Sequence, residues 1–305
     1  MSLGLVELKS VVVAARTGSF GRAAEALHIS QPALSRRIGE IEAAIGVQLF
    51  DRLPRGVRPT DACMAFLRHA EIAIASIDDA LDAAKDVKIS RTQEFTMGFV
   101  DVLCDDLLMG ACRAAMDRFA NTRILFRSAP ISRSLSGEVL SGRVKLGLRY
   151  RRDEDPQIES TFVRDDAIIV ACTASHPFAR TGRATIEQLE RELWLGYPTP
   201  SGGQSETFND ILALRGFGGW KTMALGSFHA MVRLLEGGFG VALLRREAIR
   251  TELELGRLVE IETPIPVETP IYLSWRRNSY LGEVGEFLKD TIIGRGGAPQ
   301  ARVSD

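Results

Sequence analysis

Side chains that can bind DNA gather in two short stretches near the N-terminus. In the first, Gln31 and Arg36 lie within six residues of each other, with Ser35 between them. Gln and Arg side chains can read the edges of bases, and Ser hydroxyls suit phosphate oxygens. The second stretch places three arginines around a Pro-Arg-Gly turn: Arg52, Arg55 and Arg58. The spacing predicts a surface that reads bases with one part and holds phosphates with the other.

A helix must carry the first stretch, and the sequence marks where that helix begins. Apolar residues repeat at helical spacing from Leu34 to Ile45. Ser30 is a good N-cap, and Pro32 falls in the first turn, where its missing N–H would have no partner anyway. Two shorter helical patterns precede this one. Together they predict a helix-turn-helix, whose second helix enters the major groove by its N-terminal end. A small helical bundle with a solvated charged face is the alternative.

The run from Gly18 to Arg52 resembles the N-terminal domain of LysR-type transcriptional regulators. The matching positions are Ser19, Phe20, Arg22, Ala23, Ala24, Leu27, Ser30, Gln31, Pro32, Ala33, Leu34, Ser35, Ile38, Glu42, Gly46, Leu49, Phe50 and Arg52. Cys63 is a departure, because the family commonly has glycine there. The resemblance implies a winged helix-turn-helix domain over residues 1–60 that binds double-stranded DNA. The DNA-binding residues expected there are Ser30, Gln31, Pro32, Ser35, Arg36, Arg37, Arg52, Arg55 and Arg58.

Residues 61–88 contain neither Pro nor Gly and predict one long helix. Its apolar residues form a seam with a seven-residue repeat: Leu67, Ile74 and Leu81, with Ala70, Ile77 and Ala84 between them. An ordinary core helix is the alternative, but a length of ~42 Å at 1.5 Å per residue favours a spacer. The resemblance implies a dimerisation linker helix over residues 61–90. It also favours a tetramer of two dimer pairs and adds RNA polymerase as a candidate partner.

From residue 91 onward, short apolar runs alternate with helical patterns, which predicts an α/β domain with a largely parallel sheet. "FVRDDAIIVACTASHPFA" and "MVRLLEGGFGVALLRREAI" resemble the effector domain of the same regulators, which has the two-lobed fold of periplasmic binding proteins (type 2). The expected chain is therefore multi-domain: an all-α winged helix-turn-helix head, a long linker helix and an α/β effector domain over 91–305. Lobe I would comprise 93–163 and 268–305, and lobe II 164–267.

Loops at strand ends would line a cleft between the lobes, because α/β sheets bind ligands beyond the carboxyl ends of strands. The effector-binding residues expected there are Asp101, Val102, Arg149, Thr199, Ser201, Ser227, Phe228 and His229. Asp101 has two interpretations. It is either an acidic group that pairs with Arg149 and favours effectors with amine or hydroxyl donors, or, like Asp105 and Asp106 in the first helical turn, a residue that stabilises the start of the next helix. The effector would be a small molecule of unknown identity.

Composition limits the other functions. The net charge of −1 hides an asymmetry, since residues 1–60 hold 8 basic and 5 acidic residues and the remainder 30 and 34. The four cysteines lack metal-ligand spacing, and no catalytic constellation is present, so neither a metal, a cofactor nor an enzyme is expected. The lack of a secretory or membrane-spanning segment favours the cytoplasm. A solute receptor and an α/β enzyme are the alternatives, although neither accounts for the head.

Overall fold

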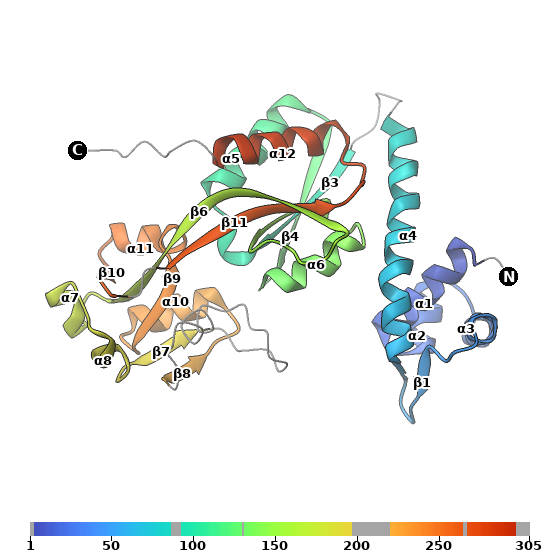
Figure 1. Ribbon diagram of the computed structural model, residues 1–305, viewed down its shortest axis with the longest axis horizontal. Helices are drawn as coiled ribbons and strands as arrows, with labels where there is room; N and C mark the ends of the chain where they lie inside the picture. The colour runs from blue at the N-terminus through green and yellow to red at the C-terminus, as the bar shows by residue number, and fades with distance from the viewer. Residues whose placement is uncertain (1–2, 87–92, 130, 197–219, 265–266, 297–305) are drawn as a thin grey trace. The chain divides into compact units, whose positions relative to one another are not determined.

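The computed structural model describes residues 3–86, 93–129, 131–196, 220–264 and 267–296 (Figure 1). The chain divides into two compact units. The first comprises residues 1–91, 138–143 and 276–282, and the second comprises the rest. Within the described residues, no helix is both long and apolar enough to cross a membrane.

The head consists of three helices and a small hairpin. Its elements are α1 (Leu5–Thr17), α2 (Phe20–Ala26), α3 (Gln31–Ile45), β1 (Phe50–Arg52) and β2 (Val57–Pro59). The apolar face predicted for the third helix is buried at Leu34, Ile38 and Ile41, each at 1% exposure or less, whereas Ile45 at its end is 37% exposed. The ring of Phe20 meets that of Phe50 edge to face at 5.5 Å, which joins the helices to the hairpin. The predicted winged helix-turn-helix is confirmed.

The linker helix is one continuous element, α4 (Asp61–Asp86), as predicted. The Thr60 hydroxyl accepts a hydrogen bond from the N–H of Cys63 at 3.1 Å and so caps its start. The Cys63 side chain is fully buried in the core of the head, which explains how the chain tolerates it there. The predicted seam divides along the helix. Leu67 packs against that core, whereas Leu81 is 51% exposed.

The second unit is built on a nine-stranded sheet with the strand order β4-β3-β5-β11-β6-β9-β7-β8, and β10 pairs with β6. The strands are β3 (Gln93–Val100), β4 (Thr122–Ala129), β5 (Leu146–Tyr150), β6 (Ile158–Thr173), β7 (Leu193–Gly196), β8 (Lys221–Ala224), β9 (Val241–Arg245), β10 (Leu258–Ile261) and β11 (Val267–Arg276). Helices and turns between them are η1 (Asp101–Leu103), α5 (Asp106–Arg118), α6 (Ser132–Leu140), α7 (Pro177–Thr181), α8 (Ile186–Leu189), α10 (Phe228–Glu236), η2 (Glu247–Ile249), α11 (Arg250–Glu254) and α12 (Gly282–Gly296).

Two long strands, β6 and β11, run between the lobes (Figure 1). The sheet is parallel where β3 pairs with β4 and β5, and where β7 pairs with β8 and β9. It is antiparallel where β11 pairs with β5 and where β6 pairs with β9 and β10. The prediction of a largely parallel sheet is therefore confirmed for β3, β4 and β5 and for β7, β8 and β9, and it is wrong for the two long strands, because β11 pairs antiparallel with β5 and β6 pairs antiparallel with β9 and β10.

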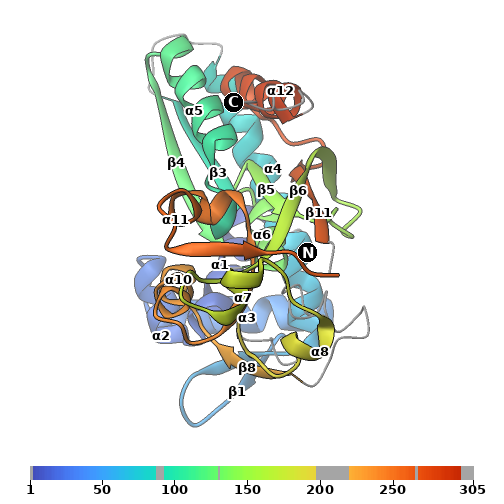
Figure 2. The same cartoon turned by 90° about the vertical axis from the view of Figure 1, so that its left-hand side faces the viewer.

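Burial of both faces explains why the second half of β6, residues 168–172, is apolar without interruption. Ile168 and Val170 belong to one core cluster, together with Trp194 of β7. Ile169 and Ala171 belong to another, on the opposite face of the strand. A strand covered on both faces reads as a continuous apolar run. In the first lobe, Figure 2 shows α5 lying along β3 and β4, with α12 beside it.

Candidate functional site

The first turn of α3 presents the predicted base-reading residues to solvent. Ser30 caps the helix by accepting a hydrogen bond from the N–H of Ala33 at 3.3 Å, and Pro32 lies in the first turn. Gln31 is exposed. The Arg36 side chain is 82% exposed and pairs with Glu40 one turn later at 3.2 Å. Exposed ion pairs of this kind are weak, so Arg36 can exchange Glu40 for another partner at little cost.

The wing places its arginines beside this turn. Nη2 of Arg52 lies 3.5 Å from the hydroxyl of Ser35 on α3, and both belong to the predicted DNA surface. Arg58 pairs with Asp51 across the hairpin at 2.9 Å. Arg55 is exposed at the tip between the two strands. Three cations on a short exposed hairpin suit the phosphate backbone of a duplex.

Arg37 is placed differently from its neighbour. Its Nη1 donates to the hydroxyl of Ser10 on α1 at 3.0 Å, and that buried hydroxyl donates in turn to the carbonyl of Val6 at 2.7 Å. Arg37 therefore helps to hold α3 against α1. Its predicted contact with DNA stays a prediction, but the structure gives it a packing role that its sequence context does not reveal.

Glu42 fixes the wing to α3. One carboxylate oxygen, Oε1, accepts hydrogen bonds from the backbone N–H groups of Leu49 at 2.8 Å and Phe50 at 3.1 Å. At the tip, Gly56 has a φ of +89°, and a Cβ there would lie 2.4 Å from the carbonyl oxygen of Gly18. Only glycine fits this approach. Helix and wing are thus held in one fixed arrangement.

The predicted effector residues that the structure describes differ in exposure and in their contacts. Asp101 and His229 are exposed, and Ser227 is the exposed N-cap of α10, accepting from the N–H of Ala230 at 3.4 Å. Phe228 is half-buried and packs in the core of lobe II. Thr199 and Ser201 lie outside the described residues.

The predicted pairing of Asp101 with Arg149 is wrong. Arg149 is 3% exposed and is bound by the carboxylate of Asp153, and its Nη1 also donates to the hydroxyl of Ser136 at 2.9 Å. The reason is strand geometry, since successive side chains of a strand point to opposite faces. Tyr150, the next residue of β5, points to the other face, where its hydroxyl lies 3.5 Å from Asp166.

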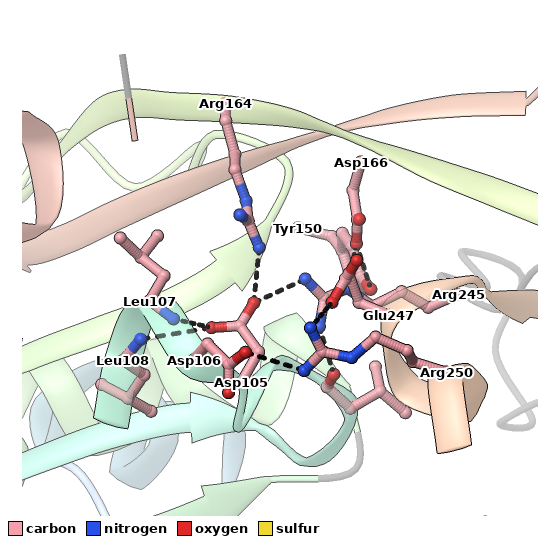
Figure 3. A network of polar contacts seen from close by, with 11 residues as sticks. Asp105, Asp106, Leu107, Leu108, Tyr150, Arg164, Asp166, Arg245, Glu247 and Arg250 are labelled. Atoms are coloured by element: carbon pink, nitrogen blue, oxygen red, sulfur yellow. Dashed lines mark hydrogen bonds and ion pairs between the residues drawn. The ribbon is translucent and has the colours of Figure 1, made fainter. Parts of the chain in front are cut away.

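A buried guanidinium joins the two lobes at the point that Tyr150 faces (Figure 3). Arg245, at the end of β9, is 1% exposed. Its Nε donates to the carboxylate of Asp166, its Nη2 to that of Asp105 at 2.6 Å, and its Nη1 to the carbonyl of Val102 at 3.0 Å. Three sides of the guanidinium are therefore hydrogen-bonded, as a buried cation requires.

The two carboxylate oxygens of Asp105 have different partners. Its Oδ1 caps α5 by accepting from the N–H groups of Leu107 and Leu108, at 3.0 and 3.2 Å. Its Oδ2 accepts from Arg245 and from Nη2 of Arg164, the latter at 2.5 Å. The helix-stabilising interpretation considered for Asp101 thus applies to Asp105, four residues later.

A second, more exposed link lies beside the first. Nη2 of Arg250 on α11 donates to the carboxylate of Asp106 at 2.7 Å, as Figure 3 shows. A pocket of about 240 Å³ opens here, lined by Asp105, Asp106, Leu107, Arg164, Glu247, Arg250, Arg295 and Gly296. Acidic and basic groups balance around it. We name the set of buried and half-buried residues Val102, Asp105, Tyr150, Arg164, Asp166 and Arg245 the interlobe network.

Burial shifts the protonation equilibria of this network. It raises the pKa of Asp166, although Arg245 opposes the shift. It also raises the pKa of Tyr150, and the neighbouring Asp166 adds to that effect. For Arg245, burial alone would lower the pKa, but the attraction of Asp166 and Asp105 outweighs it and leaves the pKa raised. Arg245 is therefore a permanent cation.

Most residues of the interlobe network cannot be predicted from the sequence. The visible signals are charged pairs that follow or interrupt apolar runs: Asp165-Asp166 before "AIIVAC" and Arg245-Arg246 after "VALL". Among the described residues, no group of three or more His, Cys, Asp or Glu side chains could hold a metal ion. The geometry presents an exposed basic surface near the N-terminus and a charged junction between the two lobes of the second unit.

Comparisons with known proteins agree with this organisation. The family model described as bacterial regulatory helix-turn-helix protein, lysR family, matches residues 5–64, and the LysR substrate binding domain matches residues 90–292. The regulator CbbR of Sinorhizobium medicae (strain WSM419) is 26% identical over 286 residues, covering 90% of this chain and 86% of that protein. BenM of Acinetobacter baylyi is 27% identical over 276 residues, covering 89% and 90%.

Solved structures share the fold. A full-length OxyR variant from Pseudomonas aeruginosa superposes with a TM-score of 0.70 at 20% identity, covering 96% of this chain and 95% of that one. Full-length CbnR in complex with its target DNA has a TM-score of 0.63 at 18% identity, covering 96% and 100%. Since one family model alone spans more than half of the residues, the chain belongs to the LysR family of DNA-binding transcriptional regulators and carries that family's effector-binding domain.

Proposed function

We propose that α3 and the wing read a specific operator, with Gln31 and Arg36 contacting base edges. Ser30, Ser35, Arg52, Arg55 and Arg58 would hold phosphates, and Pro32 would set the entry of the helix. The observation that supports this most is the fixed arrangement of helix and wing, because Glu42 binds both N–H groups at the start of the wing. Preorganised surfaces lose less entropy on binding.

The operator can be selected from a pool of random duplexes with the full chain, and variants can then be titrated on it. Gln31→Ala should cost ~1–3 kcal/mol on the operator and relax the preference at one base pair. Arg55→Ala should weaken operator and random duplex alike and reduce the salt slope by about one unit. Equal losses of Gln31→Ala on both duplexes would reject base reading by Gln31.

The exposed part of the seam on α4 supports a dimer. Ile77 is 39% and Leu81 51% exposed, and Ile74 lies on the same face. Two heads would read two half-sites of a pseudo-palindrome. In this proposal the linker comprises residues 61–90 and the effector domain 91–305. We further propose that two dimers form a tetramer, that the protein acts in the cytoplasm, and that RNA polymerase is one of its partners.

For the effector, we infer a cleft site that faces Asp101, Val102, Ser227 and His229, with Phe228 behind them. Thr199 and Ser201, which we also assign to it, lie outside the described residues. We leave Arg149 out of this site because its guanidinium is bound by the carboxylate of Asp153. Ser227 lies at the start of a nine-residue helix, where backbone N–H groups suit an oxygen of the ligand. Asp101 favours ligands with an amine or hydroxyl donor.

A thermal-shift screen of metabolites identifies the ligand, which at 100 times its Kd should stabilise its site by about 2.7 kcal/mol. Asp101→Asn and Ser227→Ala should each weaken its binding in calorimetry. Asp117→Asn, an exposed acid at the far end of α5, is the matched control and should bind normally. Wild-type affinity in both cleft variants would place the effector elsewhere.

A further inference from the structure

An aspartate on the linker helix is buried against segments from far along the chain. Asp79 of α4 is 6% exposed, and Arg276, the last residue of β11, is 5% exposed. The Asp79 carboxylate accepts from Nη2 of Arg276 and, at 3.1 Å, from the backbone N–H of Tyr280. Arg276 also donates to the hydroxyl of Ser76 on α4 at 3.2 Å. We name this contact the α4 joint.

A second contact lies nearer the start of the helix. Glu71 of α4 accepts from Nη2 of Arg16 on α1 at 2.8 Å, and Nη1 of Arg143 lies 3.6 Å from the same oxygen. Burial raises the pKa of Glu71, although Arg16 opposes the shift. Backbone packing is close here too, since a Cβ on Gly142 would lie 2.9 Å from the Cβ of Ala75. Glu71 thus connects the head to the turn before β5.

Both contacts lie at the ends of adjacent strands. Arg276 ends β11, and residues 138–143 precede β5 (Leu146–Tyr150). The two strands are paired, with Ile271 opposite Tyr150 and Ser274 opposite Gly147. Tyr150, at the far end of β5, belongs to the interlobe network, and its hydroxyl lies 3.5 Å from Asp166. Two hydrogen-bonded strands therefore run from the junction of the lobes to the residues that hold α4.

The Asp79 contact uses a different face of α4 from the exposed seam. At 3.6 residues per turn, Asp79 and Leu81 are separated by about 200° around the helix. The joint and a partner helix can therefore occupy α4 together. The joint is also incompletely satisfied, since Nε of Arg276 is buried without a hydrogen-bond acceptor among the described residues. Such partly satisfied polar networks are where an alternative arrangement is least costly.

We propose that the α4 joint transmits the state of the effector lobes to the head. A shift of β11 at the junction of the lobes would move Arg276, and the buried ion pair would carry that displacement to α4 and hence to the spacing of two heads. This inference rests on the proposed function. It adds the specific element, Asp79–Arg276, through which ligand and operator sites would be coupled.

Coupling is reciprocal, so operator binding must alter the effector domain even before the effector is known. Hydrogen exchange of the full chain, with and without the selected operator duplex, measures this. In the wild type, operator should slow exchange in β9 and β11 at least about threefold. Arg276→Gln and Asp79→Asn should each abolish that change while operator affinity stays within about threefold, and the double variant should add nothing. Lys85→Gln, which removes an exposed pair with Asp82 on the same helix, should respond like the wild type.

The outcomes separate the two proposals. If the wild type binds the operator tightly but hydrogen exchange in β9 and β11 does not change, the proposed role of the α4 joint is rejected, whereas the proposed reading of DNA by α3 and the wing is not. A response that persists in both joint variants also overturns it. Absence of specific duplex binding by the wild type overturns the proposed function and the joint with it. A joint variant that unfolds is recognised because α4 loses its protection from hydrogen exchange in the absence of DNA. In that case Arg276→Lys, which keeps the positive charge, must retain part of the operator-induced slowing of exchange in β9 and β11.

Discussion

We expect Arg245→Met to lower the free energy of unfolding of the effector domain by about 3–5 kcal/mol, the cost of removing one partner from a buried ion pair. Met fills similar volume but deprives the buried Asp166 carboxylate of the cation that binds it. The carbonyl of Val102 loses its donor as well. Asp105 suffers less, because Arg164 still binds it at 2.5 Å. Urea unfolding of the full chain, followed by tryptophan fluorescence, measures the loss, since Trp194 and Trp275 lie in this domain.

The neighbouring arginine provides the control. Arg246 pairs with Glu260 at 2.5 Å, but the two side chains are 51% and 38% exposed. Arg246→Met should therefore change stability by about 1 kcal/mol or less. Adding Asp166→Asn to Arg245→Met should recover part of the loss, because the uncompensated buried charge is removed. Equal effects of the two arginine variants would mean that the interlobe network does not hold the lobes together.

We expect Leu81→Glu to abolish the dimer and to weaken operator binding by about 10²-fold or more, because two linked heads gain affinity that one head lacks. Leu81 is 51% exposed in the single chain, so the charge should leave the folding of the monomer nearly unchanged. In a seam between two helices, the same glutamate would be buried without a partner. Sedimentation velocity and operator titration measure both effects.

Ala65→Glu is the matched control, since Ala65 is an exposed alanine of the same helix that points about 160° away from Leu81 and at least about 120° away from Ile74 and Ile77. It should sediment as the wild type does and bind operator with the same affinity. A Leu81→Glu protein that remains dimeric and binds operator normally would place the dimer interface away from this face of α4.

The head can be predicted from the sequence because its signals are local. Ser30, Pro32 and the apolar spacing from Leu34 onward mark the start and the buried face of α3, and each acts within a few turns of helix. The linker helix is equally predictable, because a run without Pro or Gly has few alternatives. The exposure of Gln31 and Arg36 follows directly from the same periodicity.

The interlobe network cannot be predicted in the same way, because it depends on contacts between residues far apart in the chain. Arg245 and Asp105 are separated by 140 positions, and the same holds for the α4 joint, where Asp79 and Arg276 are separated by 197. In the strand-end loops, the side chain that faces the cleft depends on strand register, and a shift of one residue exchanges the faces. That is why the sequence points to Arg149 although Tyr150 faces the network. The sequence also does not reveal the packing role of Arg37, because its partner Ser10 lies on α1, which packs against that side of α3.

The most direct test compares two affinities of the full-length wild-type chain at one fixed salt concentration: its Kd for the selected operator and its Kd for a shuffled duplex of the same length and composition. Sequence-specific regulators bind their operators about 10³-fold or more tightly than other DNA. We predict a ratio of at least that size, with a footprint of two half-sites on one face of the duplex. A ratio close to one would contradict the assignment of α3 and the wing as an operator-reading surface.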